Sequence, residues 1–498
     1  MNAKNSVKTT PPRNKSKSNK KLIPYILLVL VPVVLIVIAL IFFNKQNPSG
    51  SSVLDDSAVS WSTYSEQTIE LEDSLKISNP GVYTLSGEIS DGMIEINTSG
   101  IVKLILNGVT VKNSSGPAIL VSEAETVFLE TVEGTTNTFS DSSSYKTSDE
   151  DICATVFSKD DLVLQGSGTL IVTGNYEDGI VSKDDLKITS GTYKLDTKDE
   201  GIRGRDSVEI SGGTFEISAG GDAIKSNNSD EVGKGTVKIS GGDFSISAGD
   251  DGIHAESALE ISGGTINIEK SYEGLEGSSV TISGGDIKVV ASDDGVNAAG
   301  GNDGSSPNMA RYQASSSNYK IEISGGNLYV NSQGDGLDSN GSLTVSGGAV
   351  VVDGPINSAN GALDAEAGVF YNGGSLIAVG ASGMATAPSE ASSGHSLSVY
   401  FDSTYSAGTK LSVKDSSGNL VLSHVSSKSF SHASLSSEQF KEGETYIIYI
   451  NEAEVNSVTI SGKTSRVGSG AQEMMMGPGG GGAPAGAGGN QRRGWNNP

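Results

Sequence analysis

The stretch Val208-Glu-Ile-Ser-Gly-Gly-Thr-Phe-Glu-Ile217 indicates how this chain folds. Apolar residues alternate with polar ones before and after a Gly-Gly turn, and such alternation is typical of half-buried strands. Similar turns recur along the chain, mostly 21 to 23 residues apart, with three longer gaps. The second glycine of each turn, or its equivalent, lies at Gly168, Gly191, Gly213, Gly242, Gly264, Gly285, Gly326, Gly348 and Gly374.

A third short apolar site follows each turn, as at Ile180, Ile202 and Ile224. Three short strands in a repeat of about 22 residues predict a parallel β-helix, in which each rung completes its core by stacking on the next at about 4.8 Å. A leucine-rich repeat would lack the Gly-Gly turn, and a propeller blade has about 40 residues or more. The sequence therefore predicts an all-β protein built on a parallel β-helix.

The repeats also set the predicted domain boundaries. Residues 62–394 are expected to form the β-helix, with a looser pattern over 62–150 and a long polar loop near 300–318. Residues 395–466 alternate differently and predict a small C-terminal antiparallel β cap. The Gly/Ala/Pro-rich residues 467–498 are predicted to be disordered.

The N-terminus has the pattern of a membrane anchor. Residues 1–21 carry seven bases and no acid, and residues 22–43 form a run of 22 residues without a charge. A helix of that length spans roughly 33 Å, which matches a bilayer core, and the apolar run of a signal peptide would be shorter. The positive-inside rule places residues 1–21 in the cytoplasm. With residues 44–61 as a linker, the sequence predicts a single-pass protein of the cell membrane whose bulk is extracellular.

The formal charge is −25, and beyond residue 45 it is −33, from 26 bases and 59 acids. Such a balance argues against a nucleic-acid partner, which needs a basic face. Cys153 is the one cysteine, so an intrachain disulfide and a zinc site with two cysteines are excluded.

An acid recurs once per repeat, usually just before a glycine. These acids are Asp178, Glu200, Asp222, Asp251, Glu273, Asp294 and Asp335. Asp-Gly is a favoured turn, which gives a structural explanation, but glutamate is a poor turn former and appears twice. Stacked carboxylates about 5 Å apart repel by roughly 3 kcal/mol at an effective dielectric of about 20. Several oxygen ligands in a row favour Ca²⁺, so the column predicts calcium binding.

A second column stands three residues after the acids and begins Val181, Arg203, Lys225, His254, Glu276. Its early members are bases, and its later ones are acidic or neutral. Two explanations stay open, namely a ladder of surface salt bridges, worth little per pair, and a groove where Ca²⁺ and bases together hold an anionic polymer.

Several segments resemble one bacterial family, the clostridial surface carbohydrate-binding proteins. They are Ile105–Val111, Glu133–Thr138, Phe157–Leu162, Gly174–Gly191 and Asp199–Asp206. The resemblance covers roughly residues 62–465 and is most specific over the first four of the repeats counted from Gly168. It implies a right-handed parallel β-helix that contains calcium, binds cellulose or polygalacturonate-like glycans and is related in fold to pectate lyases.

Matched position by position, the resemblance implies two sets of site residues. Those expected to hold Ca²⁺ are Asp178, Asp184, Asp185, Asp199, Glu200, Asp206, Asp222, Asp250 and Asp251. Those expected to contact carbohydrate are Lys183, Arg203, Arg205, Lys225 and His254.

Two other classes of function remain open at this point. In a polysaccharide lyase, Ca²⁺ would acidify the proton alpha to a uronate carboxyl, and Lys225 or Arg203 would remove it. In an adhesive or structural surface protein, the partner would be another protein. The sequence favours a binding protein over an enzyme.

Overall fold

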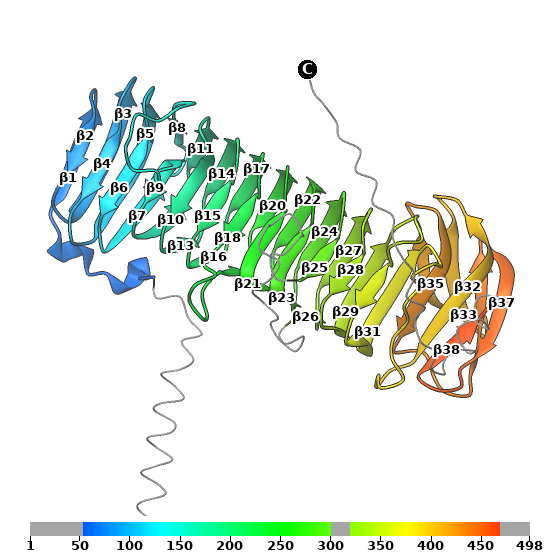
Figure 1. The fold of residues 1–498 in the computed structure, drawn as a ribbon. Helices are drawn as coiled ribbons and strands as arrows, with labels where there is room; N and C mark the ends of the chain where they lie inside the picture. Colours follow the sequence, from blue (N-terminus) through cyan, green and yellow to red (C-terminus); the bar gives the residue numbers. More distant parts are fainter. Residues whose placement is uncertain (1–52, 300–318, 469–498) are drawn as a thin grey trace, which may run out of the picture. The chain divides into compact units, whose positions relative to one another are not determined.

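The computed structural model describes residues 53–299 and 319–468. These residues form strands joined by turns, preceded by two single-turn 3₁₀ helices, η1 (Asp56–Ala58) and η2 (Trp61–Thr63). The all-β class predicted from the alternation is confirmed. Figure 1 shows the strands side by side in chain order.

Most strands stack in three parallel columns, which we call A, B and C, and each rung of the chain visits them in that order. Column A contains β1 (Glu66–Leu71), β7 (Thr126–Thr131), β10 (Asp161–Gly166), β13 (Asp185–Ile188), β16 (Ser207–Ile210), β19 (Thr236–Ile239) and β26 (Lys320–Ile323). Column B contains β8 (Thr136–Ser140), β11 (Thr169–Gly174), β14 (Thr192–Thr197), β17 (Thr214–Ala219), β20 (Asp243–Ala248), β22 (Thr265–Ser271), β24 (Asp286–Ala291) and β27 (Asn327–Ser332). Column C contains β2 (Leu75–Ile77), β4 (Ile94–Asn97), β6 (Ile119–Glu123), β9 (Ala154–Ser158), β12 (Asp178–Ser182), β15 (Ile202–Gly204), β18 (Ile224–Ser226), β25 (Val296–Ala298), β28 (Leu337–Ser339) and β30 (Leu363–Ala365).

Six longer strands continue from one column into the next. Those that run from A into B are β3 (Gly81–Ile89), β5 (Val102–Lys112), β29 (Ser342–Asp353) and β31 (Gly368–Gly380). Those that run from C into A are β21 (Ile253–Ile261) and β23 (Leu275–Ile282).

The register converts the sequence repeat into stacks of identical side chains. In column A, Ile210 pairs with Ile239, which pairs with Ile261, and all three are almost fully buried. In column B, the ring centroids of Phe215 and Phe244 lie 4.5 Å apart with the planes 4° from parallel. The parallel pairing predicted from the period is confirmed, because each strand meets its counterpart one repeat later. The right-handed sense of the coil stays a prediction.

The turn glycines are required by their backbone conformation and by close packing between rungs. Gly326 has φ of +78°, which other residues rarely adopt, and a Cβ there would lie 2.7 Å from the backbone of Gly284 and Gly285. The glycines after the acids are different. Gly295 does not have positive φ, but a Cβ there would lie 2.6 Å from the carbonyl oxygen of Gly336.

The C-terminal strands form a mixed unit with a hydrophobic core of its own, and β31 contributes to both this core and that of the β-helix. β35 (Phe430–Ser437) pairs antiparallel with both β31 and β32 (Ser396–Tyr405), and β38 (Thr464–Val467) pairs parallel with β32. A second, antiparallel sheet has the order β34-β33-β36-β37, made of β34 (Leu420–Val425), β33 (Lys410–Asp415), β36 (Thr445–Ile450) and β37 (Ala453–Thr459).

Some sequence predictions fall outside the part of the chain that the structure describes. They are the anchor at 22–43 with its basic flank 1–21, the loop near 300–318 and the tail from residue 469. Within residues 53–299 and 319–468, no helix is long and apolar enough to cross a membrane.

Candidate cation and glycan site

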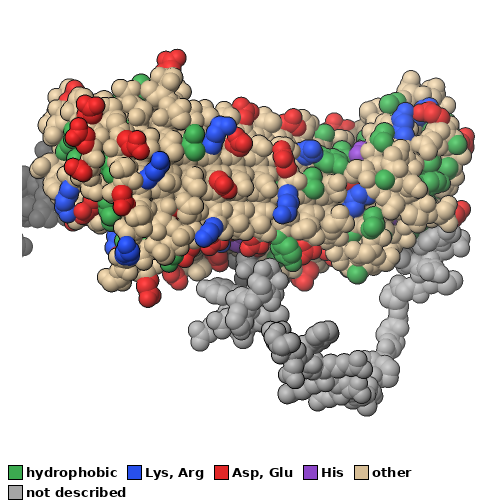
Figure 2. Space-filling model, turned by 90° about the horizontal axis from the view of Figure 1, so that it is seen from above, with side chains coloured by type: hydrophobic (Ala, Val, Ile, Leu, Met, Phe, Trp, Pro, Cys, Tyr) green, Lys and Arg blue, Asp and Glu red, His purple; other side chains and the backbone are tan. Residues whose placement is uncertain are grey.

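The recurring acids occupy the corner between columns B and C, which we call the acid corner. Asp178 begins β12, and Glu200 lies two residues before β15. The corner is largely closed to solvent, with exposed fractions of 1% for Asp178, 2% for Asp222 and 4% for Glu273. Acidic side chains also gather along one long edge of the face shown in Figure 2, whereas acids and bases are scattered over the rest of that face.

The aspartates of the acid corner bind the backbone of the next rung. Oδ1 of Asp178 accepts a hydrogen bond from the amide of Glu200 at 3.1 Å. The same bond recurs from the amide of Asp251 to Asp222 at 2.8 Å, and from the amide of Asp335 to Asp294 at 2.6 Å. Where the corner residue is aspartate, this short side-chain acceptor closes the corner on the next rung, which is a structural reason for aspartate there.

In the early rungs the bases of the second column turn toward these acids. Arg203 pairs with Asp178. Lys225 bridges two rungs, with Nζ 3.0 Å from a carboxylate oxygen of Glu200 and 2.7 Å from one of Asp222. The residues expected to contact carbohydrate and those expected to hold Ca²⁺ thus neutralise one another here.

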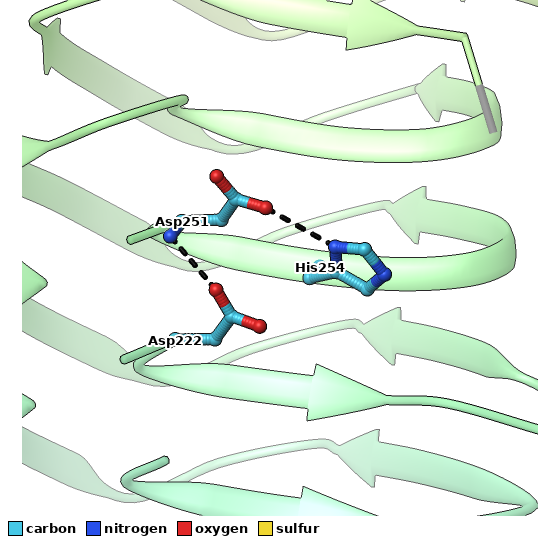
Figure 3. Close-up of side chains that lie close together, drawn as sticks. All are labelled: Asp222, Asp251 and His254. Atoms are coloured by element: carbon cyan, nitrogen blue, oxygen red, sulfur yellow. Dashed lines mark hydrogen bonds and ion pairs between the residues drawn. The ribbon is translucent and has the colours of Figure 1, made fainter. Parts of the chain in front are cut away.

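His254 makes the same kind of contact one rung later. Its Nδ1 lies 3.1 Å from Oδ2 of Asp251 (Figure 3). The same nitrogen pairs also with Glu276 in the next rung. Burial by itself would lower the pKa of His254, but the nearby carboxylates of Asp251, Glu256 and Glu276 outweigh it and hold the pKa well above its ordinary value. The imidazole therefore acts as a buried cation in the column, in line with Arg203 and Lys225.

These pairs occupy the bases that were expected to contact carbohydrate, and they are the kind of contact that the salt-bridge explanation of the second column predicts. The side chains of Arg203, Lys225 and His254 are only 18%, 23% and 11% exposed. The pKa of Lys225 is raised, because Asp222 and Glu200 outweigh the lowering effect of its burial. The physical reason is that an acid buried in a corner is stabilised by the nearest base, and the register supplies one from the neighbouring strand.

A second acidic corner lies between columns C and A. Carboxylate oxygens of Asp161, Asp184 and Asp185 lie within 4.8 Å of one another. Burial, followed by the neighbouring Asp206, raises the pKa of Asp184 to about 7. Asp185 accepts a hydrogen bond of 2.6 Å from Ser207.

Three further predicted site residues around this second corner are committed to ion pairs. Asp206 pairs with Lys234 and Arg205. Arg205 also reaches Asp230 at 3.3 Å, and Lys183 lies 3.2 Å from Asp151. Asp199 and Asp250 are exposed at the outer rim of the acid corner.

In the later rungs of the acid corner, the residues that the structure describes supply no such compensation. We call Asp294, Asp335 and Asp338 the open acid cluster, because their carboxylate oxygens lie within 4.8 Å of one another and, among the described residues, no base pairs with them. Burial first, and the charge of Asp335 next, raises the pKa of Asp338 to about 7. Burial also raises the pKa of Asp294 to about 7.

Two buried oxygens lie beside this part of the column without a partner. Asn297 and Glu276 are 4% and 3% exposed, and Oδ1 of Asn297 and Oε1 of Glu276 have no hydrogen bond within the described chain. Glu276 pairs in register with Asn297, which pairs with Asp338. Burial raises the pKa of the adjacent Glu273 to about 9. Unpartnered buried oxygens and uncompensated carboxylates are the features that a bound cation would satisfy.

The calcium ligands matched through the resemblance end at Asp251, whereas the acid column read from the spacing includes Asp294 and Asp335 but not Asp338. The available signal was the second column itself, where bases give way to Glu276, Asn297 and Asp338. Loss of the base marks where the acid corner is left uncompensated.

Comparison with known proteins supports the resemblance inferred from the sequence. A family model described as carbohydrate-binding domain-containing protein matches residues 71–310. A protein of the same description from Acetivibrio thermocellus is 35% identical over 125 residues, which is 24% of this chain and 44% of that protein. The chain thus matches less than half the length of this relative. The match to carbohydrate-binding proteins is confirmed over 71–310.

A solved structure described as the polysaccharide lyase-like protein from C. thermocellum, gadolinium derivative, is also similar. It shares 31% sequence identity over 45% of this chain and 92% of its own, with a TM-score of 0.39.

Proposed function

We propose that this protein binds an acidic plant-cell-wall-type polysaccharide through Ca²⁺ held at the acid corner. The observation that carries the proposal is the open acid cluster, where Asp294, Asp335 and Asp338 converge without a base from the described chain. The match of residues 71–310 to carbohydrate-binding proteins supports the ligand class.

Calcium is the cation that fits these donors. Carboxylate and amide oxygens are hard ligands, and Ca²⁺ accepts about 6–8 of them in loose geometry. Asp294, Asp335, Asp338 and Oδ1 of Asn297 are the residues that would hold it. When bound, Ca²⁺ supplies positive charge and open coordination positions, which a sugar carboxylate or hydroxyl can occupy. An acidic protein thereby gains attraction for an acidic polymer. Asp161, Asp184 and Asp185 form a second set of ligands of the same kind.

Binding is favoured over lyase chemistry by the state of the bases. A lyase needs an unprotonated base to remove the proton alpha to the uronate carboxyl. Lys225 and Arg203 are both held in ion pairs with buried acids, and the pKa of each is raised above its ordinary value. Such groups stay protonated and hold the rungs together.

The same proposal places the protein at the outer face of the cell membrane. The uncharged run 22–43 and the basic residues before it support an anchor with the N-terminus inside. Protease added to intact cells should degrade residues 53–468 and spare the N-terminal segment. Protection of the whole chain would contradict this location.

The test of function combines a binding and a product assay on polygalacturonate. The full chain should co-sediment with the polymer in Ca²⁺ and be released by EDTA, without the ultraviolet absorbance of an unsaturated uronate. Absorbance that grows with time would establish the lyase instead. Equal binding in Ca²⁺ and EDTA would reject calcium dependence, and no binding to polygalacturonate or cellulose would favour a protein partner.

A further inference from the structure

A groove lies on column B where the last rungs meet the C-terminal strands, far along the chain from the early acid pairs. Its floor and rim come from β22, β24, β27 and β29, and one wall comes from β34. We call it the junction groove. Its lining includes Asn267, Lys288, Tyr329, Val351 and His424.

The register sets the spacing of the groove. Asn267 pairs with Lys288, Lys288 with Tyr329, and Tyr329 with Val351 in successive parallel strands. These outward side chains therefore follow one another at the interstrand distance of about 4.8 Å. Along the groove, the polar side chains of Asn267 and Lys288 come first, the partly exposed ring of Tyr329 follows, and the apolar Val351 comes last.

Asp353 holds both His424, in the wall of the groove, and the ring of Tyr329 in place. This carboxylate is fully buried and accepts hydrogen bonds from Nε2 of His424 at 2.6 Å and from the hydroxyl of Tyr329 at 2.9 Å. Ser427 donates to it through both its amide, at 2.8 Å, and its hydroxyl. The orientation of Tyr329 and His424 is thus set before any ligand arrives, which lowers the entropic cost of binding.

Polar groups in the groove retain hydrogen-bonding capacity. Oδ1 of Asn267 is buried without a partner, although its amide nitrogen donates to Glu269 at 3.2 Å. Nε2 of His424 is used by Asp353, and within the described chain Nδ1 has no partner. Lys288 is exposed and, among the described residues, forms no ion pair. Oδ1 of Asn267 and Nδ1 of His424 can accept hydrogen bonds from the hydroxyls of a ligand, and Lys288 can donate hydrogen bonds to the ligand's oxygens.

Two other grooves on the same β-helix are lined by charges that compensate each other. In one, Lys194 lies 2.7 Å from Glu216, and in the other Lys238 lies 3.9 Å from Glu260. Neither contains a tyrosine or a histidine. The junction groove alone among these three combines an aromatic face, unsatisfied polar atoms and a fixed wall, which are the features of a small-molecule site.

We propose that the junction groove is a second carbohydrate subsite, which binds pyranose units of a neutral, cellulose-like polysaccharide without a divalent cation. A pyranose ring has an apolar face that can lie on Tyr329 and Val351, and a rim of hydroxyls that Asn267, Lys288 and His424 can bind. The proposal rests on the function proposed above, that the chain binds polysaccharide. It assigns a role to Tyr329, Val351 and His424, which lie beyond the matched residues 71–310.

The test measures binding of the full chain to regenerated cellulose and to polygalacturonate, each in Ca²⁺ and in EDTA. In EDTA, cellulose binding should persist, and Tyr329→Ala and Lys288→Ala should each weaken it by about tenfold, the loss expected for a residue central to an interface. Lys194→Ala is the matched control, since Lys194 lies in the same outward column four strands earlier. It should bind like the wild type. Melting curves for each variant show whether the fold is kept, and Lys288 is exposed enough for its removal to leave it intact.

The outcomes separate the two proposals. Loss of all binding in EDTA, with calcium-dependent binding to polygalacturonate retained, overturns the junction groove and leaves the proposed function standing. Equal weakening by Lys194→Ala and Lys288→Ala also overturns the groove, because binding would then depend on surface charge. Absence of binding to either polymer under both conditions removes both proposals.

Discussion

Lys225→Met should destabilise the protein strongly, because it removes the cation between two buried acids. The Lys225 side chain is 23% exposed, and those of Asp222 and Glu200 are 2% and 11% exposed. Methionine fills a similar volume, so the effect comes mainly from the lost charge. Breaking a buried ion pair by removing one partner costs about 3–5 kcal/mol, since the remaining charge is left uncompensated. We expect a loss in that range at pH 7.

The matched control is Lys194→Met on column B. Lys194 also pairs across rungs, with Glu216 at 2.7 Å, but the two side chains are 51% and 69% exposed. An exposed pair contributes about 0–1 kcal/mol. Both variants remove one lysine and an interrung ion pair, but Lys225 also pairs with Asp222 of its own rung, so the two variants differ in burial and in the number of pairs lost.

The assay is urea unfolding followed by circular dichroism at pH 7 and at pH 4. In Lys225→Met the unpaired carboxylates have raised pKa values, so the penalty is present above those values and shrinks as protons neutralise the acids at low pH. Equal stability loss in the two lysine variants would refute the role assigned to burial. A loss that is the same at both pH values would refute the electrostatic origin.

Three further predictions follow from the same structure. In EDTA, the free energy of unfolding should fall as the pH rises from about 4 to about 7, because the pKa of Asp294 near 7 lies above its unfolded value of about 3.9. Asp294→Asn should reduce this slope. An unchanged slope would show that Asp294 does not cause the pH dependence. Ile239→Asp should abolish cooperative melting of the β-helix, since it buries a charge at a site that is 1% exposed. A melting temperature equal to that of the wild type would show that Ile239 does not face the core, and hence that the strand register is wrong. Gly295→Ala should cost about 1–3 kcal/mol in urea unfolding, as its Cβ would lie 2.1 Å from Val330, whereas a neutral effect would mean that the rungs are not packed this closely.

The period of the glycines was sufficient to predict the stacked rungs and both columns of charges. The reason is that a parallel β-helix converts sequence spacing directly into strand register. Arg203 and Lys225, for example, are register partners in neighbouring strands, and so are Lys225 and His254. The spacing of residues in the sequence therefore shows which residues of neighbouring rungs lie side by side, and it was enough to predict the acid corner.

Side-chain direction and long-range contacts could not be predicted in this way. The spacing did not indicate that Arg203 and Lys225 turn inward to the acids, since that depends on burial and on which carboxylates lack another partner. The junction groove depends on His424 meeting Asp353 across 71 residues of chain. No repeat relates these two positions, because the C-terminal strands leave the β-helical register.

The proposed calcium site at the open acid cluster is tested most directly by calorimetric titration of the chain with Ca²⁺. The variant Asp294→Asn/Asp335→Asn/Asp338→Asn should lose a binding site that the wild type has. The control Asp196→Asn/Asp243→Asn/Asp402→Asn removes three exposed acids and changes the net charge equally, so it should titrate like the wild type. Equal calcium binding by both triple variants and the wild type would contradict the claim that the open acid cluster holds the cation.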